Sequence, residues 1–295
     1  MNSRTTLLTV ITAATVAAIV SLLLAFSLGK NVPAREVPAN LYSQIQSHGV
    51  IRAAYAVGAP LFIVDPNTGN KSGIFYDIVN EAAARLGLKV NWNEEVGYGQ
   101  MIEGLQAGRY DLVGSGIWIN ADRARSADFT IPLYYDAVYA YAKVGDERFG
   151  PHLEQLNSST YRISTMDGEL GATIAQTDFP KAQTLQLPQS ADFTQMILNV
   201  VNKKADITFL SSAAARAYQA ANPGQIVAVD PTSPLRIFPN AIMLPQGQYE
   251  LRQALDNTLE GMLDDGTINK ILARYEKMPG SFLRIAPPYE PASSQ

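Results

Sequence analysis

The residues best suited to chemistry lie in one short stretch, residues 114–123, with the sequence Gly-Ser-Gly-Ile-Trp-Ile-Asn-Ala-Asp-Arg. This stretch follows an apolar run, residues 110–113, that predicts a short buried strand. The glycines on either side of Ser115 free the backbone, so its N–H groups can approach a ligand closely. Asn120 is a good helix N-cap, which places Arg123 in the first helical turn beyond the strand. Backbone donors beside a guanidinium favour the binding of a carboxylate.

Composition excludes several other functions. The 295 residues suggest one or two domains with a sizeable core, and the net charge of −4 provides no basic stripe for nucleic acid. The absence of cysteine excludes disulfides, thiolate metal sites and cysteine nucleophiles. The two histidines, His48 and His152, are far apart in the sequence. We therefore expect no metal site, no cofactor and no histidine-based catalysis.

Motifs spread along the chain extend this interpretation. Besides the stretch that runs from Ser115 to Pro132, they are Gly49-Val-Ile-Arg52, Gly73-Ile-Phe-Tyr-Asp77-Ile78, Leu105-Gln-Ala-Gly-Arg-Tyr-Asp111 and Asp264-Asp-Gly-Thr-Ile268. In order and spacing, residues 49–276 resemble the family 3 solute-binding proteins, periplasmic receptors that deliver polar amino acids to ABC importers. The resemblance implies the periplasmic-binding-protein type 2 fold. In that α/β fold, two lobes are joined by two crossing strands and the ligand lies in the cleft between them.

The N-terminus carries the strongest membrane signal. Residues 7–28 are almost wholly apolar and long enough to cross a bilayer as a helix. Residues 1–30 are therefore a signal or membrane-anchor segment. Small-residue cleavage positions at 32–34 and 37–39 lie beyond the apolar run, so a cleaved signal peptide and an uncleaved anchor both stay open, and we favour the anchor. Residues 31–40 form a proline-containing linker, and the rest of the chain is expected outside the cytoplasm.

The remaining chain alternates strands and helices, which is typical of parallel α/β sheets. We expect residues 41–144 to form the first part of lobe 1, residues 145–232 to form lobe 2, residues 233–278 to return to lobe 1, and residues 279–295 to form a loose tail. The expected crossing segments are residues 139–145 and 231–240. Among the local expectations are a strand at 110–113, helices at 98–107 and 190–202, the latter capped by Ser190, and a return strand at 241–244.

Arg123 is the expected carboxylate clamp, with Ser115 and the Gly116 amide completing the grip. The alternative is a surface arginine paired with Asp122 or Asp128, which would contribute little. The family often has a serine or threonine where this chain has Trp118. That tryptophan either walls the cleft or belongs to the core.

Other positions follow from the resemblance. Tyr98 lies where the family places an aromatic residue against the ligand, although an exposed tyrosine at a helix start is the alternative. Tyr55 lies near the end of the first strand, where the family uses a polar or aromatic contact. Gly168 lies where the family has a glycine followed by a ligand-contacting Thr or Ser.

The largest difference from the family's pattern concerns the residue that would bind an amine of the ligand. The family's acidic residue for this group falls on Ser211 in this chain, and a buried ammonium without a counter-charge is costly. Glu169 is the candidate replacement. Its alternative role is that of an acid in the first turn of a helix, which the helix dipole favours. If no residue replaces the acid, the ligand lacks an α-amine.

The expected function is binding of a small carboxylated, amino-acid-like solute for an ABC importer, with the transporter permease as partner. The protein would act in the periplasm or on the extracytoplasmic face of the inner membrane, tethered by residues 7–28 if these are uncleaved. One alternative is an enzyme similar to cyclohexadienyl dehydratases. Such an enzyme needs a general acid in the cleft, and residues 211–215 contain none. Another alternative is a membrane-tethered sensor module.

Overall fold

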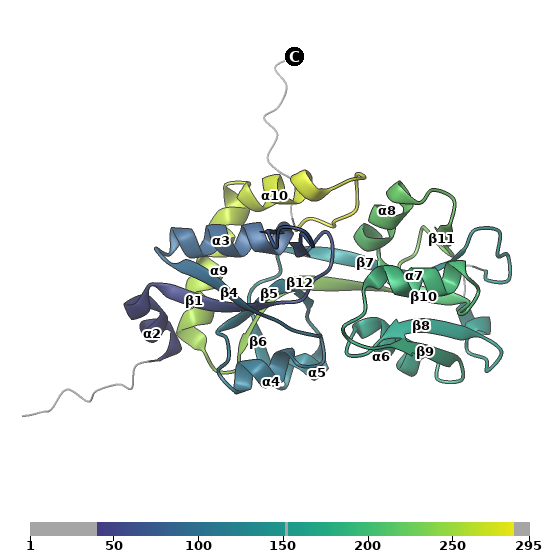
Figure 1. Cartoon of the computed structure of the whole chain (residues 1–295), viewed down its shortest axis with the longest axis horizontal. Helices are drawn as coiled ribbons and strands as arrows, with labels where there is room; N and C mark the ends of the chain where they lie inside the picture. The colour runs from purple at the N-terminus through teal and green to yellow at the C-terminus, as the bar shows by residue number, and fades with distance from the viewer. Residues whose placement is uncertain (1–39, 151–152, 286–295) are drawn as a thin grey trace, which may run out of the picture. The chain divides into compact units, whose positions relative to one another are not determined.

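The computed structural model describes residues 40–150 and 153–285 (Figure 1). The chain separates into two units, residues 1–40 and residues 41–295. All helices and strands described below belong to the second unit. The apolar segment 7–28, the cleavage positions and nearly all of the linker lie outside the described residues. In the described part of the chain, every helix is too short or too polar to span a bilayer.

The first lobe is built on three parallel strands, β1 (Val50–Tyr55), β4 (Lys89–Glu95) and β5 (Leu112–Trp118). Its helices are α2 (Leu41–His48), α3 (Ile74–Arg85), α4 (Met101–Gln106), α9 (Tyr249–Asp264) and α10 (Thr267–Tyr275). Small elements complete it: the hairpin β2 (Ile63–Val64) and β3 (Lys71–Ser72), the short helix α5 (Ala121–Ala124) and strand β6 (Ala127–Phe129).

The second lobe repeats this scheme with three parallel strands, β8 (Arg162–Met166), β9 (Gln183–Leu187) and β10 (Ile207–Ser211). Its helices are α6 (Leu170–Asp178), α7 (Phe193–Val201) and α8 (Ser212–Ala221), with a 3₁₀ turn at Leu153–Leu156 and an added strand, β11 (Ile226–Ala228).

Two long strands, β7 (Tyr134–Lys143) and β12 (Arg236–Pro245), join the lobes. They pair antiparallel from Asn240 opposite Tyr134 to Arg236 opposite Val138, and one continuous sheet runs in the order β4-β1-β5-β12-β7-β10-β8-β9. The two-lobe type 2 architecture with two crossing strands is therefore confirmed. The expected first crossing segment, 139–145, is displaced, because residues 139–142 of β7 pair with β10 in the second lobe.

Each lobe has apolar side chains on both faces of its sheet, as expected when helices cover both faces. In the first lobe, Ile51 and Ala53 of β1 face α3, α9 and α10, whereas Ala54 faces the α4 side. In the second lobe, Phe209 packs with α6 and its neighbour Leu210 packs with α7. Figure 1 shows these helix layers on opposite sides of the strands. The two-residue side-chain period of a strand explains the division.

Asp111 and Asp77, two acidic residues of the motifs named above, connect elements of the first lobe by hydrogen bonds. The Asp111 carboxylate accepts hydrogen bonds from the Arg52 guanidinium, at 2.6 Å in the shortest contact, and from the Arg52 amide. Asp77 at the start of α3 accepts from the Tyr275 hydroxyl at 2.9 Å and from Arg274, both on α10. These motif positions therefore fix the framework that carries the site.

Some local expectations are wrong. β5 does not end before the glycines but continues through Gly114 and Gly116 to Trp118, α4 begins only at Met101, and β12 extends from Arg236 across Pro239. The cap of α7 is Asp192, whose carboxylate accepts from the Thr194 amide at 2.6 Å. Asn120 does cap α5 as expected, accepting from the Arg123 amide at 2.8 Å.

The described start of the expected tail, up to residue 285, is packed rather than loose. Phe282 is buried, 5.2 Å edge-on from the Tyr134 ring, and Leu283 forms a backbone bridge with Tyr135 of β7. The Ser212 hydroxyl and the Arg216 guanidinium, both on α8, donate to carbonyls of this segment. The segment therefore contacts lobe 1, the crossing strand and lobe 2.

This packing generates a stability prediction. Phe282→Ala should lower the free energy of unfolding by about 3 kcal/mol, because it removes a fully buried ring and leaves a cavity beside Tyr134. Leu283→Ala is the matched control, since that side chain is 38% exposed and its backbone bridge is retained. Urea unfolding of both variants measures the difference. Equal stabilities for the two variants would show that the segment is a loose tail after all.

Candidate ligand-binding site

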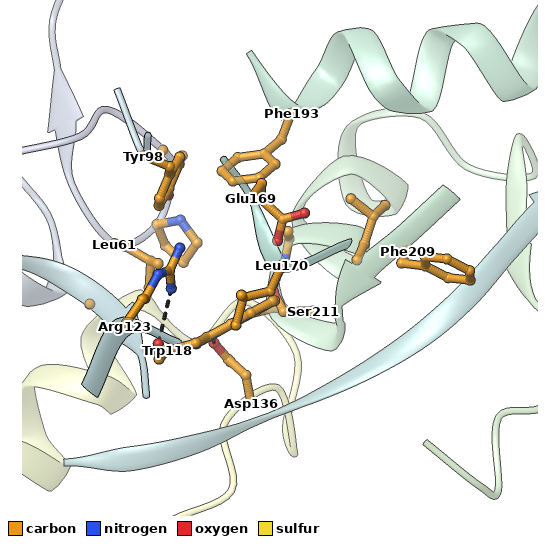
Figure 2. Close-up of a pocket in the computed structure, with 17 residues that line it drawn as sticks. Leu61, Tyr98, Trp118, Arg123, Asp136, Glu169, Leu170, Phe193, Phe209 and Ser211 are labelled. Carbon is orange, nitrogen blue, oxygen red and sulfur yellow. Dashed lines mark hydrogen bonds between the residues drawn. The ribbon is translucent and has the colours of Figure 1, made fainter. Parts of the chain in front are cut away.

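A cavity lies at the carboxyl ends of the lobe strands and against β7, and both lobes contribute to it (Figure 2). Its volume is about 50 Å³, which exceeds the space that a single water molecule needs. Aromatic and apolar side chains dominate its lining, with few polar groups. The lining includes Gly58, Pro60, Leu61, Tyr98, Gly116, Trp118, Arg123, Asp136, Glu169, Leu170, Phe193, Phe209, Leu210 and Ser211.

Arg123 is the cation of this cavity among the described residues. Its Nη1 donates to the Trp118 carbonyl at 2.9 Å and its Nη2 donates to the Gly168 carbonyl at 3.2 Å, a contact from lobe 1 to lobe 2. Figure 2 shows the guanidinium beside Tyr98 with the first bond dashed. Burial lowers the pKa of Arg123, and the charge of Glu169 partly offsets this effect. The guanidinium therefore lies where an added negative charge would be favourable.

The alternative role of Arg123 as a surface ion-pair partner does not fit this geometry. Asp122 pairs with Arg125 at 2.9 Å instead, and Asp128 accepts a hydrogen bond from the Gly247 amide. Within the described residues Arg123 forms no ion pair with a carboxylate. Two of its five N–H groups are used by carbonyls, which leaves donors for a ligand.

Glu169 faces the cavity from the second lobe, at the start of α6. Its Oε2 accepts from the Gly171 amide at 2.5 Å, so it acts as the N-cap of α6. Burial raises the pKa of Glu169 to about 7, although the backbone bonds and the charge of Arg123 act in the opposite direction. Glu169 is thus not in the first turn of the helix, as the alternative expectation had it, but caps α6 and lines the cavity with the same side chain.

Four aromatic residues line the cavity, namely Tyr98, Trp118, Phe193 and Phe209. Tyr98 lies 6.1 Å from the Phe193 ring of the second lobe, and burial raises the pKa of the Tyr98 hydroxyl. Trp118 lines the cavity and stacks on Phe238 of β12, with ring centroids 4.8 Å apart. Trp118 thus serves both as cavity wall and as part of the packing between strands.

Asp136, which was not among the predicted site residues, lies on β7 and lines the cavity. Its Oδ2 accepts from Trp118 Nε1 at 2.9 Å and from Asn240 Nδ2 at 2.7 Å. Burial raises the pKa of Asp136 to about 6 despite these two bonds. The signal available in the sequence was a single carboxylate in an otherwise uncharged run, residues 129–142.

Of the other predicted site residues, some line the cavity and some do not. Gly116 and Ser211 line the cavity, and Ser211 also caps α8 by accepting from the Ala214 amide at 3.2 Å. Ser115 lies outside the lining, because its buried hydroxyl accepts from the Ala56 amide at 2.7 Å. Tyr55 also lies outside, stacked on Phe62 with centroids 4.4 Å apart. Ser115 therefore holds the chain just beyond β1 by a hydrogen bond, and Tyr55 packs against Phe62, both outside the cavity lining.

The glycines near the site allow close approach. A Cβ on Gly116, whose φ is +75°, would lie 2.4 Å from the Phe75 ring, so this glycine is required by packing as well as by backbone conformation. A Cβ on Gly168 would lie 2.5 Å from the Gly99 amide of the other lobe, and that amide donates to Gln189 Oε1 at 3.2 Å. Gly168 takes part through its carbonyl, which receives Arg123, and through this contact between lobes.

The sequence profile of the bacterial extracellular solute-binding proteins, family 3, matches residues 51–278. The chain belongs to this family. Its members act outside the cytoplasm as solute-binding proteins, and the two-lobe fold is consistent with that membership.

Solved structures agree on the fold. An ancestral amino acid-binding protein, described as a precursor of cyclohexadienyl dehydratase, has a TM-score of 0.72 and 24% identity, over 81% of this chain and 100% of that one. A putative binding component of an ABC transporter from Wolinella succinogenes, complexed with lysine, has a TM-score of 0.70 and 21% identity, over 78% and 97%. An amino acid ABC transporter substrate-binding protein from Streptococcus pneumoniae, bound to L-arginine, has a TM-score of 0.69 and 21% identity. The match covers 82% of this chain and 98% of that one.

The two buried acids predict a pH dependence. Glu169 and Asp136 have raised pKa values in the folded state, about 7 and about 6, so the folded protein retains protons that the unfolded chain has released. Their stabilising contribution is complete below the ordinary carboxyl pKa and is lost as the pH rises through 6 and 7. Without ligand, the melting temperature should therefore fall between pH 5 and pH 8.

The double variant Glu169→Gln with Asp136→Asn should have a flatter profile, because neither amide ionises. Asp122→Asn serves as the control at an exposed carboxylate. Thermal unfolding followed by circular dichroism measures all three proteins. Identical slopes for the wild type and the double variant would contradict the assignment.

Proposed function

We propose that this protein is the extracytoplasmic receptor of an ABC importer and binds a small, amino-acid-like carboxylate in the cavity between its lobes. The observation that carries the proposal is the Arg123 guanidinium, which lies in that cavity without a carboxylate partner among the described residues. Membership of a solute-binding family supports the proposal. Neighbours named as amino acid-binding components of ABC transporters support it as well.

The carboxylate of the ligand is assigned to Arg123. A guanidinium presents its N–H groups in a fork that matches a carboxylate, and such charge-assisted bonds are stronger than neutral ones. The guanidinium also contacts the Gly168 carbonyl of lobe 2, so a ligand bound there lies at the junction of the lobes. Tyr98 and Trp118 supply aromatic walls for the remainder of the ligand.

The α-amine of the ligand is assigned to the acidic part of the cavity, with Glu169 as one contributor. Burial disfavours the charged form of this carboxyl, and an ammonium nearby would relieve that cost. The Gly171 amide occupies one acceptor site of the Glu169 carboxylate, and a carboxylate offers about four such sites. Glu169 can therefore cap α6 and bind the amine at the same time.

Binding would favour the closed arrangement of the lobes, because the ligand contacts both of them. The permease would then recognise this closed form. Residues 7–28, if uncleaved, would hold the receptor at the extracytoplasmic face of the membrane. A sensor module with the same tether remains an alternative use of the same ligand-driven closure.

One variant tests the carboxylate clamp. Arg123→Ala should weaken binding of the cognate solute by about 2–5 kcal/mol, because the desolvated carboxylate loses its charge-assisted partner. Arg125→Ala is the matched control, since Arg125 is exposed and pairs with Asp122. Isothermal titration calorimetry measures both variants. Wild-type affinity in Arg123→Ala would refute the site.

A second experiment tests the amine. Thermal shift with amino acids, each paired with its des-amino analogue, should show larger shifts for the amino acids, since ligand at ~100 times its dissociation constant adds about 2.7 kcal/mol of stability. Glu169→Gln should reduce the amino-acid shifts selectively, because the amide keeps the helix cap but carries no charge. Equal shifts within every pair, unchanged by Glu169→Gln, would show that no amine is recognised.

A cyclohexadienyl-dehydratase-like enzyme is the second candidate, and one observation favours it. Residues 211–215 contain no acid, yet Glu169 and Asp136 place two buried carboxyls with raised pKa values in the cavity. Either could serve as a general acid near neutral pH. Mass spectrometry of a cyclohexadienyl solute recovered after incubation separates the two functions, because a receptor returns the solute unchanged.

A further inference from the structure

The two oxygens of Asp136 have different surroundings. Oδ2 accepts from the Trp118 indole at 2.9 Å and from the Asn240 amide at 2.7 Å. Oδ1 is also buried, but it makes no hydrogen bond with the described residues. The side chain is 1% exposed and rises from β7 toward Trp118 and the cavity (Figure 2). Half of this carboxylate is therefore used by the fold and half is left for another partner.

A purely structural role does not explain a carboxylate at this position. Holding the two donors, Trp118 Nε1 and Asn240 Nδ2, needs only one acceptor oxygen, which a neutral amide also provides. A buried charged oxygen without a donor costs free energy. Asp136 forms no ion pair within the described residues, and its raised pKa indicates that its neighbours do not compensate for burial.

We propose that Asp136 Oδ1 binds the ammonium group of the ligand. This assignment deepens the proposed function and rests on it, because the ligand must first be an amine-bearing carboxylate bound in the same cavity. Asp136 then supplies the counter-charge that Ser211, which stands at the family's acidic position, does not provide. The acid comes from the crossing strand instead of the start of α8.

The chemistry of an ammonium fits this arrangement. An ammonium has three donors and needs several acceptors, and Asp136, Glu169 and Ser211 all line the cavity. The Ser211 hydroxyl already accepts from the Ala214 amide, so its oxygen is a weaker acceptor than a carboxylate. The Trp118 indole N–H donates to Asp136, which leaves this tryptophan as a wall of the cavity.

The substitution Asp136→Asn separates the ligand role from the structural role. The amide oxygen can accept from Trp118 and Asn240 as Oδ2 does, whereas the NH₂ group takes the place of Oδ1 and cannot accept from an ammonium. Asp256→Asn is the matched control. Asp256 is a half-buried carboxylate, which accepts from the Ile131 amide at 2.8 Å and does not line this cavity.

Calorimetry of the purified protein with amino acids and their des-amino analogues is the test. Asp136→Asn should weaken amino-acid binding at least tenfold and leave the des-amino analogues unchanged, so that the preference for an amine collapses. Asp256→Asn should keep the wild-type preference. If Asp136→Asn binds amino acids with wild-type affinity, the assignment of Asp136 is wrong while the carboxylate site stands.

Other outcomes are also decisive. If the wild-type protein binds des-amino analogues as tightly as amino acids, the assignment of Asp136 fails but the Arg123 site remains. If it binds neither, the proposed function fails and this assignment fails with it. Should Asp136→Asn not fold, Asp136→Ser provides a second test. The hydroxyl can still accept a hydrogen bond but carries no charge, so the preference for an amine should collapse here as well, and an unchanged preference would overturn the assignment.

Discussion

The pairing of β7 with β12 is the interaction on which the rest of the structure depends. Backbone hydrogen bonds between residues 134–138 and 236–240 merge two lobe sheets into one, and the same strands carry the only described connections between the lobe sheets. Asn240 pairs with Tyr134 on one side and with Trp118 on the other. The side chains of Asp136, Asn240 and Trp118 are therefore fixed at one point by sheet register, without the need for a loop.

This constraint explains why the cavity combines rigid walls with unfavourable charges. Burial lowers the pKa of Arg123 and raises the pKa values of Glu169 and Asp136, so each side chain is in an environment that disfavours its own ionised form. A zwitterionic ligand would relieve all three effects together. Perturbed titratable groups gathered in a cleft are typical of functional sites. Under the proposed function, the free energy lost by burying these charges would favour a ligand of complementary charge.

Much of the fold could be predicted from the sequence, because apolar periodicity and capping residues act locally. Asn120 correctly indicated α5, and the expected helix at 190–202 corresponds to α7, although α7 begins only at Phe193. Arg123 could also be placed, since a strand end followed by a capped turn fixes its position. The glycines of 114–116 were misleading. Their freedom suggested a loop, whereas the rings of Trp92 and Phe75 require their small size within β5.

The cavity lining includes Asp136 and omits Ser115, and the two differences from the sequence analysis have the same physical cause. Ser115 alternates with Gly116 along a strand, so only one of the two can face the cavity, and the register that decides between them is set by β1 and β12. Asp136 lies opposite Phe238 of β12, and its carboxylate accepts from Asn240, so its partners are distant in the sequence. Local patterns do not contain such pairings. Side-chain roles that depend on tertiary register therefore had to come from the structure.

Gly168 has a consequence for how sequence variation at this site is interpreted. Its α-carbon lies so close to Gly99 that any side chain would strike the backbone of the opposite lobe, and its φ of +75° disfavours other residues as well. An alanine at position 168 would obstruct the approach of the two lobes sterically. It would reduce the fraction of molecules whose lobes can close, and the apparent affinity for a ligand falls in proportion to that fraction. A change at Gly168 would thus resemble loss of a ligand contact in any binding assay, although no side-chain atom that touches the ligand had been removed.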